Sequence, residues 1–105
     1  MNRAGVAALM KQMFEEENST RESAQVEYAH DDSNALGNFE RLAAELKLDR
    51  KTVLWIYFRK HIDGILAHIN GHKSQREPIQ GRIKDARVYL VLLRAMIEED
   101  EASQK

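Results

Sequence analysis

The second half of the sequence places a run of cationic side chains beside aromatic ones. Arg59, Lys60 and His61 directly follow Tyr57 and Phe58, so groups that can carry positive charge stand next to flat rings. Cations attract phosphates, and aromatic faces stack on bases. This combination predicts a site for an anionic ligand of the nucleotide class.

A second set of complementary groups follows at helical spacing. Arg82, Asp85 and Tyr89 are three and four residues apart, which puts them on one face of a helix. Arg82 could clamp a phosphate, Asp85 could accept a hydrogen bond from a base or ribose, and Tyr89 could stack. The alternative is an ordinary intrahelical ion pair between Arg82 and Asp85, with Tyr89 in the core. Both interpretations stay open at this point.

The histidine spacing is the feature closest to a metal motif. His68 and His72 are four residues apart, a separation at which two imidazoles on one helix can share an ion, and His61 precedes His68 by seven. However, Asn70-Gly71 should end the helix between the pair, and no acidic residue is placed to complete a site. We therefore predict no metal site and no cofactor.

Catalytic motifs are absent from the sequence. It has no cysteine, which excludes thiolate catalysis and cysteine zinc sites. It has no glycine-rich phosphate loop and no recognisable Ser/His/Asp set. Asp63 and Asp85 are the only acids embedded in apolar or basic helical surroundings, and two carboxylates are too few for a two-metal hydrolase. We assign no catalytic residue.

The elements that position these side chains are predicted to be helices. One proline and five glycines interrupt the chain, and no segment alternates apolar and polar residues as a half-buried strand does. The fold class is therefore all-α, a small four-helix bundle-like domain covering residues 1–105. We expect helices over residues 3–16, from Ser33 or Asn34 to Leu48, from Asp49 to Ile69 and from Pro78 to Ile97, with a long polar loop at 17–33 and a frayed tail at 98–105.

Apolar residues at intervals of three and four mark the face that each helix should bury. The last two helices share a short connection and should pack as an antiparallel hairpin, which gathers His68, His72, Lys73, Arg76 and Arg82 at one end. The expected buried stripes are Leu36, Phe39, Ala43 and Leu46; Leu54, Phe58, Ile62, Ile65 and Ile69; and Ile79, Ile83, Ala86, Leu90, Leu93 and Ile97. A wider apolar face through Val88, Leu92 and Met96 should contact the first helix or another subunit.

Length and charge limit the classes of partner. A domain of 105 residues buries only about two thirds of the surface that its unfolded chain exposes, so association into a homo-oligomer is expected to add burial. Sixteen basic residues are balanced by 17 acidic ones, and the net charge of −1 argues against binding of duplex nucleic acid. No run approaches the ~18 apolar residues of a membrane span. A cytoplasmic location is the simplest interpretation.

Two segments resemble small phage and prophage proteins related to the nucleotide-modification-associated domain 1 group: EYAHDDSNALGNFERLAAEL and RKHIDGILAHINGHKSQREPIQGRIKDARVYLVLL. The family pattern reads as a Tyr-Gly or Tyr-Ala turn, an Asn-Phe-x-Arg helix, a Lys-His pair and a closing Asp-x-x-x-Tyr helix. The resemblance covers most of the chain and implies an association with nucleotide metabolism or modification, in the host cytoplasm if a phage encodes the protein. Its pattern falls on Asn38, Arg41, Lys60, His61, Arg76, Arg82, Asp85 and Tyr89.

The closing helix is also similar to the last helix of MazG-like all-helical nucleotide pyrophosphatases. Those enzymes hold magnesium with a Glu-x-x-Glu pair followed later by Glu-x-x-Asp. Here Glu40 and Glu45 are five apart, and Arg82 stands before Asp85. Loss of the carboxylate cage with retention of basic and aromatic groups is what a binding protein would show.

Together these features predict a phage-type protein that binds a nucleotide or nucleotide-derived small molecule without turning it over, and that could sequester a host defence signal. One alternative is a magnesium-dependent MazG-like nucleotide pyrophosphatase. Another is a protein-interaction module that inhibits a host enzyme through its apolar faces. The predicted ligand-binding residues are Asn38, Arg41, Arg59, Lys60, His61, His72, Arg76, Arg82, Asp85 and Tyr89.

Overall fold

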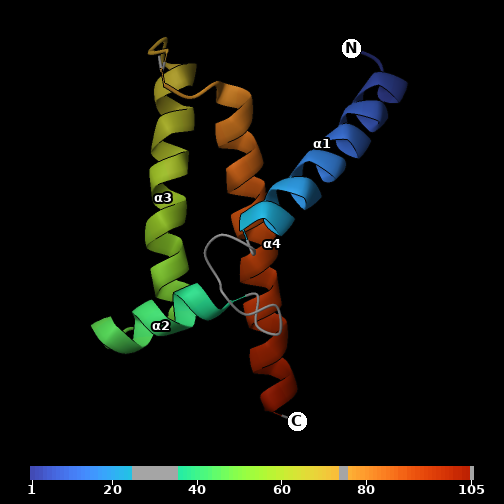
Figure 1. Ribbon diagram of the computed structural model, residues 1–105. Helices are drawn as coiled ribbons and strands as arrows, with labels where there is room; N and C mark the ends of the chain where they lie inside the picture. Colours follow the sequence, from blue (N-terminus) through green and yellow to red (C-terminus); the bar gives the residue numbers. More distant parts are fainter. Residues whose placement is uncertain (25–35, 74–75, 105) are drawn as a thin grey trace.

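The computed structural model describes residues 1–24, 36–73 and 76–104, and every regular element within these ranges is a helix (Figure 1). The helices are α1 (Arg3–Ala24), α2 (Gly37–Leu46), α3 (Arg50–Ile69) and α4 (Ile79–Ser103). The predicted all-α fold class is therefore confirmed. None of the described helices combines the length and the apolar composition that crossing a lipid bilayer requires.

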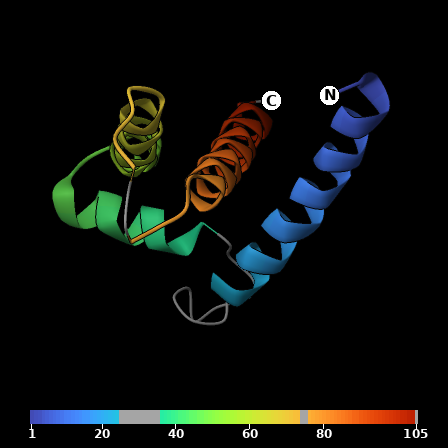
Figure 2. The same ribbon diagram turned by 90° about the horizontal axis from the view of Figure 1, so that it is seen from above.

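The α3–α4 hairpin is the frame of the molecule. The two helices run side by side and antiparallel, as predicted, with their connection at one end (Figure 1). α2 lies crosswise against the opposite end of α3, whereas α1 packs on α4 and projects away from the hairpin (Figure 2). α4 therefore has α3 on one side and α1 on another.

Local sequence signals set the ends of the hairpin helices. The Asp49 carboxylate caps α3 by accepting a hydrogen bond of 2.7 Å from the backbone N–H of Lys51. Asn70 ends the helix, and Gly71 follows with a φ of 92°, a left-handed conformation that favours glycine. Pro78 immediately precedes α4, where its missing N–H costs no helical hydrogen bond. These boundaries agree with the predicted ones to within one residue.

The core fills the space between α2, α3 and α4. Leu54 of α3 and Met96 of α4 are fully buried, and Phe58 and Ala86 lie in the same cluster. Leu36, at the start of α2, closes the cluster from the third side. Burying a leucine or methionine side chain stabilises the folded state by roughly 1.5–3 kcal/mol. A few side chains therefore supply much of the cohesion of the hairpin.

α4 buries only part of the predicted stripe: Ala86 is buried and Leu93 packs on the core, but the helix is rotated towards Met96. Met96 is fully buried, whereas Leu90 and Ile97, which belong to the predicted stripe, are 48% and 40% exposed. Tyr89 and Leu92 pack on the core beside Met96. The helix is apolar over two overlapping faces, and the face that carries the tyrosine is the one that meets the aromatic rings of α2 and α3.

Two predicted core residues at helix ends are exposed. Ile69 is the last residue of α3 and is 72% exposed, and Leu46 is the last residue of α2 and is 53% exposed. A residue in the last turn has no following turn of its own helix to cover it, so its burial depends entirely on other elements. No other described helix covers the side chain of Ile69 or of Leu46.

α1 is longer than predicted. It extends to Ala24 rather than to Glu16, so residues 17–24 of the predicted polar loop are helical. Glu17 is buried against α4, with its Oε1 atom 2.9 Å from Nε of Arg87 in an ion pair that lacks hydrogen-bond alignment. Arg87 is 70 residues away from Glu17 in the sequence, and its positive charge compensates for the burial of the Glu17 carboxylate. Local sequence patterns alone place Glu17 at a helix end.

The predicted frayed tail is also helical, because α4 continues to Ser103. Asp100 in this segment pairs with Lys51 and Arg50 of α3, which anchors the last turns of the helix. The other predictions for the loop and the tail concern residues 25–33, the caps Ser33 and Asn34, and Lys105, all of which lie outside the described residues.

Arg50 joins three helices at the end of the hairpin opposite the connection. Its guanidinium donates hydrogen bonds to Glu40 of α2 at 2.8 Å, and to Glu99 and Asp100 of α4 at 2.9 Å each. A further bond of 3.2 Å reaches the carbonyl oxygen of Met96. The Arg50 side chain is only 17% exposed. We refer to Arg50, Lys51 and their acidic partners as the Arg50 network.

The Arg50 network offsets two unfavourable helix ends. Cations at a helix N-terminus and acidic residues at a C-terminus both oppose the helix dipole, yet α3 begins with Arg50 and Lys51 and α4 ends in an acidic run. Hydrogen bonds from Lys51 and Arg50 hold the pKa of Asp100 below its ordinary value of 3.8. The stabilisation from this carboxylate is therefore present above pH 3.8 and is lost as the pH falls through the lower folded-state pKa.

Replacing Arg50 with methionine should lower the free energy of unfolding by about 2 kcal/mol at pH 7, because hydrogen bonds between charged groups are lost from a largely buried position. Urea denaturation measures the change. The deficit should shrink below pH 3.8, where protonation of Asp100 weakens the network in the wild type as well.

Arg94→Met is the matched control for this substitution. Arg94 lies on α4, its side chain is 82% exposed, and it pairs with Glu98 one turn away. Exposed pairs of this kind contribute about 0.3–0.5 kcal/mol. Equal losses in Arg50→Met and Arg94→Met would contradict a special role for the Arg50 network.

Candidate anion-binding site

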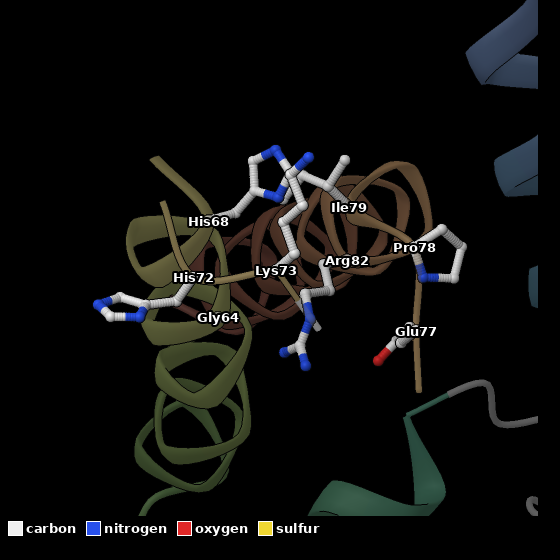
Figure 3. A pocket seen from close by; sticks show the side chains of 8 residues that line it. All are labelled: Gly64, His68, His72, Lys73, Glu77, Pro78, Ile79 and Arg82. Atoms are coloured by element: carbon white, nitrogen blue, oxygen red, sulfur yellow. The ribbon is translucent and has the colours of Figure 1, made fainter. Parts of the chain in front are cut away.

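A cavity of about 180 Å³ lies at the connection end of the hairpin. α3, the connection and the start of α4 all contribute to its wall (Figure 3). Four of its side chains can carry positive charge and one is acidic, so its lining suits an anion. The lining residues are Gly64, His68, His72, Lys73, Glu77, Pro78, Ile79 and Arg82. We call this site the hairpin cavity.

The cavity brings together most of the basic residues that the hairpin was expected to gather. His68, His72, Lys73 and Arg82 all line it. Arg76, from the same expected set, is exposed and is not part of the lining. The antiparallel packing of α3 and α4 is sufficient to explain this meeting, since the end of one helix must lie beside the start of the other.

The position of Arg82 depends on the absence of a side chain at Gly64. A Cβ atom added to Gly64 would lie 2.0 Å from Nη1 of Arg82 and 2.8 Å from its Cζ, well inside contact distance. The guanidinium therefore rests on the bare backbone of α3, in the wall of the cavity (Figure 3). A planar cation with several donors, held in this way, has the geometry that binds phosphate or carboxylate in a bidentate manner.

The two cavity histidines do not converge. The imidazole of His72 points away from Arg82 and is exposed, whereas that of His68 points to another side of the site (Figure 3). Across residues 1–24, 36–73 and 76–104, no three His, Cys, Asp or Glu side chains lie close enough to share a metal ion. The cavity is therefore described best as two cations, Lys73 and Arg82, that share a small space with two histidines and Glu77.

Further polar groups continue from the cavity into the α3–α4 interface. Asp85 is half-buried, and burial raises the pKa of its carboxyl, against the opposing charge of His61. The charge of Glu77 and a hydrogen bond with it raise the Asp85 pKa further. Glu77 in the wall of the cavity and the interior carboxyl of Asp85 thus interact electrostatically. Perturbed carboxyl groups of this kind are common in functional sites.

His61 and Tyr89 pack against each other in the same interface. Their ring centroids are 5.2 Å apart, and Nδ1 of His61 is buried without a hydrogen-bond partner in the described part of the chain. Phe39 of α2 meets Tyr89 and Tyr57 edge-on, at centroid distances of 6.0 and 6.2 Å. Burial raises the pKa of Tyr89. Tyr89 is thus partly a core residue, as the alternative interpretation of the sequence held.

Other predicted site residues lie elsewhere. Arg59 is exposed and pairs with Asp63 one turn away, with its Nε atom 3.1 Å from the carboxylate, and Lys60 is exposed as well. On α2, Arg41 donates a hydrogen bond of 2.8 Å to Asn38 at the surface. Successive helical residues are 100° apart, so only His61 of the Arg59–Lys60–His61 run faces α4.

Of the residues that line the cavity, only His72 and Arg82 belong to the predicted ligand-binding set. Gly64 and Glu77 are two of those that sequence reasoning missed. Gly64 had a detectable signal, because a glycine inside an otherwise good helix costs about 1 kcal/mol relative to alanine and often marks a close approach. Glu77 had none, since an acidic residue in a polar connection is unremarkable before the fold is known. Comparison of the chain with protein-family models, curated proteins and solved structures gave no match.

Asp85→Asn should make the protein more stable at pH 7. Because the folded-state pKa of Asp85 is raised, the protonated form favours folding below the ordinary pKa of 3.8, and this advantage is lost as the pH rises through the folded-state value. Asparagine stays neutral throughout. Thermal unfolding of both proteins from pH 3 to pH 7 should show the Tm of the variant rising relative to the wild type, and a constant difference would contradict the buried-charge explanation.

Proposed function

We propose that this protein binds a phosphate-bearing small molecule, a nucleotide or a nucleotide derivative, in the hairpin cavity without turning it over. The observation that carries the proposal is the Arg82 guanidinium seated on the bare backbone of Gly64 in the cavity wall. A glycine inside a helix lowers stability, so its pairing with a cation at a cavity favours a binding role over a structural one.

The size and lining of the cavity specify which part of such a ligand it would hold. Pockets that enclose whole drug-sized ligands are about 300–1,000 Å³, whereas this cavity is about 180 Å³. A phosphate or pyrophosphate group fits that space, with Arg82 as a bidentate partner and Lys73 as a point charge. The sugar and base would extend past His72 towards solvent. Tight binding without turnover would sequester the ligand, which is how a phage protein could silence a host signal.

Titration calorimetry with pyrophosphate and with mono-, di- and cyclic nucleotides tests the proposal. Arg82→Gln should weaken binding of pyrophosphate about 10- to 100-fold, the equivalent of one charge-assisted hydrogen-bonding group. Arg94→Gln makes the same charge change at an exposed position on the same helix and should leave affinity within about twofold. Absence of binding by the folded wild type to any of these probes would overturn the proposal.

Gly64→Ala separates binding from folding at the same site. The new methyl group must displace the Arg82 guanidinium, which is the flexible end of a side chain, while alanine improves helix propensity by up to about 1 kcal/mol. We expect unchanged or higher stability together with at least about tenfold weaker pyrophosphate binding. Unaltered affinity in this variant would mean that the seated position of Arg82 is irrelevant to the ligand.

Hydrolysis of the same ligand is the second candidate, and one observation favours it. Burial, and to a smaller extent the charge of Glu77, raises the pKa of the Asp85 carboxyl, and a carboxyl with a raised pKa can act as a general acid or base. Release of phosphate or pyrophosphate from a nucleoside triphosphate, with magnesium present and lost in Asp85→Asn, would favour the enzyme over the binding protein.

A further inference from the structure

α1 carries an apolar face that the other described residues leave largely uncovered. Val6, Met10 and Phe14 follow one another at intervals of four along the helix and are 46%, 59% and 65% exposed. α1 packs only on α4 among the described helices, through Met13 and Glu17 near the middle of the helix. Its first turns extend free of the hairpin (Figures 1 and 2).

The adjoining face of α4 is exposed in the same way. Leu90 and Val91 are 48% and 63% exposed, and they lie one turn along from Arg87, the residue that contacts α1. The uncovered residues of α1 and α4 therefore flank one junction between the two helices. Large exposed apolar surfaces on small proteins mark sites of association.

The total surface area indicates how much more the chain could bury. It exposes 8067 Å², whereas a compact monomer of its mass of 12.1 kDa exposes about 6,000 Å². Its radius of gyration is 15.7 Å, against about 13 Å for a compact domain of this length. Covering only half of the surplus on each of two chains would bury about 2,000 Å² in total, which reaches the range of obligate homodimers.

The charges along α1 favour a second copy of the same helix as the partner. The first 14 residues contain basic side chains, Arg3 and Lys11, and no acidic ones, whereas the next two, Glu15 and Glu16, are acidic and exposed. Two α1 helices that pair antiparallel about Met10 place the basic start of each beside the acidic segment of the other. Their helix dipoles are then also opposed, which is favourable.

We propose that α1 and the adjoining face of α4 form the interface of a two-fold dimer of this chain, in which the two α1 helices pair antiparallel about Met10. A two-fold interface buries the same patch on both subunits, so each α1 covers the exposed residues of its counterpart. The hairpin cavity lies outside this interface, because α1 residues do not line it.

Sedimentation velocity of the full chain over a range of concentrations tests the dimer. The sedimentation of the wild type should correspond to twice the chain mass of 12.1 kDa. Met10→Glu should sediment as a monomer, because a dimer of this variant would bury two carboxylates at the two-fold axis. Ala8→Glu is the control, since it adds the same charge on the opposite side of α1 at an exposed position. This variant should remain a dimer.

Cysteine cross-linking provides a readout that does not require a disruptive variant. The chain has no cysteine of its own, so Met10→Cys should form a disulfide-linked dimer on mild oxidation, whereas Ala8→Cys should not. A wild type that is monomeric at all concentrations, with no cross-link from Met10→Cys, would overturn the proposal and leave the α1 face to a different protein. Equal cross-linking by the two variants would contradict the antiparallel pairing.

Discussion

One guanidinium ties α3 to both α2 and α4. Arg50 contacts α2 and two acidic residues of α4 from the first position of α3, so it fixes the hairpin at the end where the chain provides no connection. The covalent connection fixes the other end. A slip of one helical turn is 5.4 Å, enough to move Gly64 away from Arg82 and His61 away from Tyr89. The cavity and the interior polar groups exist because both ends are held.

Interior polar groups and stabilising ion pairs occupy opposite ends of the same pair of helices. The interior groups Asp85 and His61 lower the stability of the α3–α4 interface, because burial disfavours the charge of the first and leaves a ring nitrogen of the second without a hydrogen bond among the described residues. The Arg50 network contributes at the opposite end, where water still reaches its acidic partners. The groups that lower the stability of the hairpin thus lie near the cavity, whereas the ion pairs that offset them lie at the other end.

Sequence reasoning succeeded where the cause of a feature is local. The cap at Asp49 and the stop at Asn70-Gly71 follow from single residues, and the cluster of basic groups follows from the short connection alone. It failed where the cause lies far along the chain. The burial of Glu17 in α1 depends on Arg87, and the rotation of α4 depends on which of two apolar faces fits the rings of α2 and α3.

The same limit applies to the candidate site. Arg82 could be singled out from its spacing to Asp85 and Tyr89, but its seat on Gly64 belongs to another helix. Arg59 and Lys60 are next to His61 in the sequence. Neighbouring residues of a helix nevertheless point in different directions, so these two side chains face away from the ring of His61. Periodicity can choose among the faces of one helix only when the position of the neighbouring helix is known.

The two ends of the hairpin also differ in charge, which gives a protein of nearly zero net charge an electric dipole. Lys73 and Arg82 stand at the connection end, whereas α4 finishes in the acidic run Glu98–Glu101, which Arg50 and Lys51 neutralise only in part. An approaching anion is repelled from one end and attracted to the other, so it is oriented before it makes contact. Its rate of association would therefore fall with ionic strength even though the net charge of the protein is only −1.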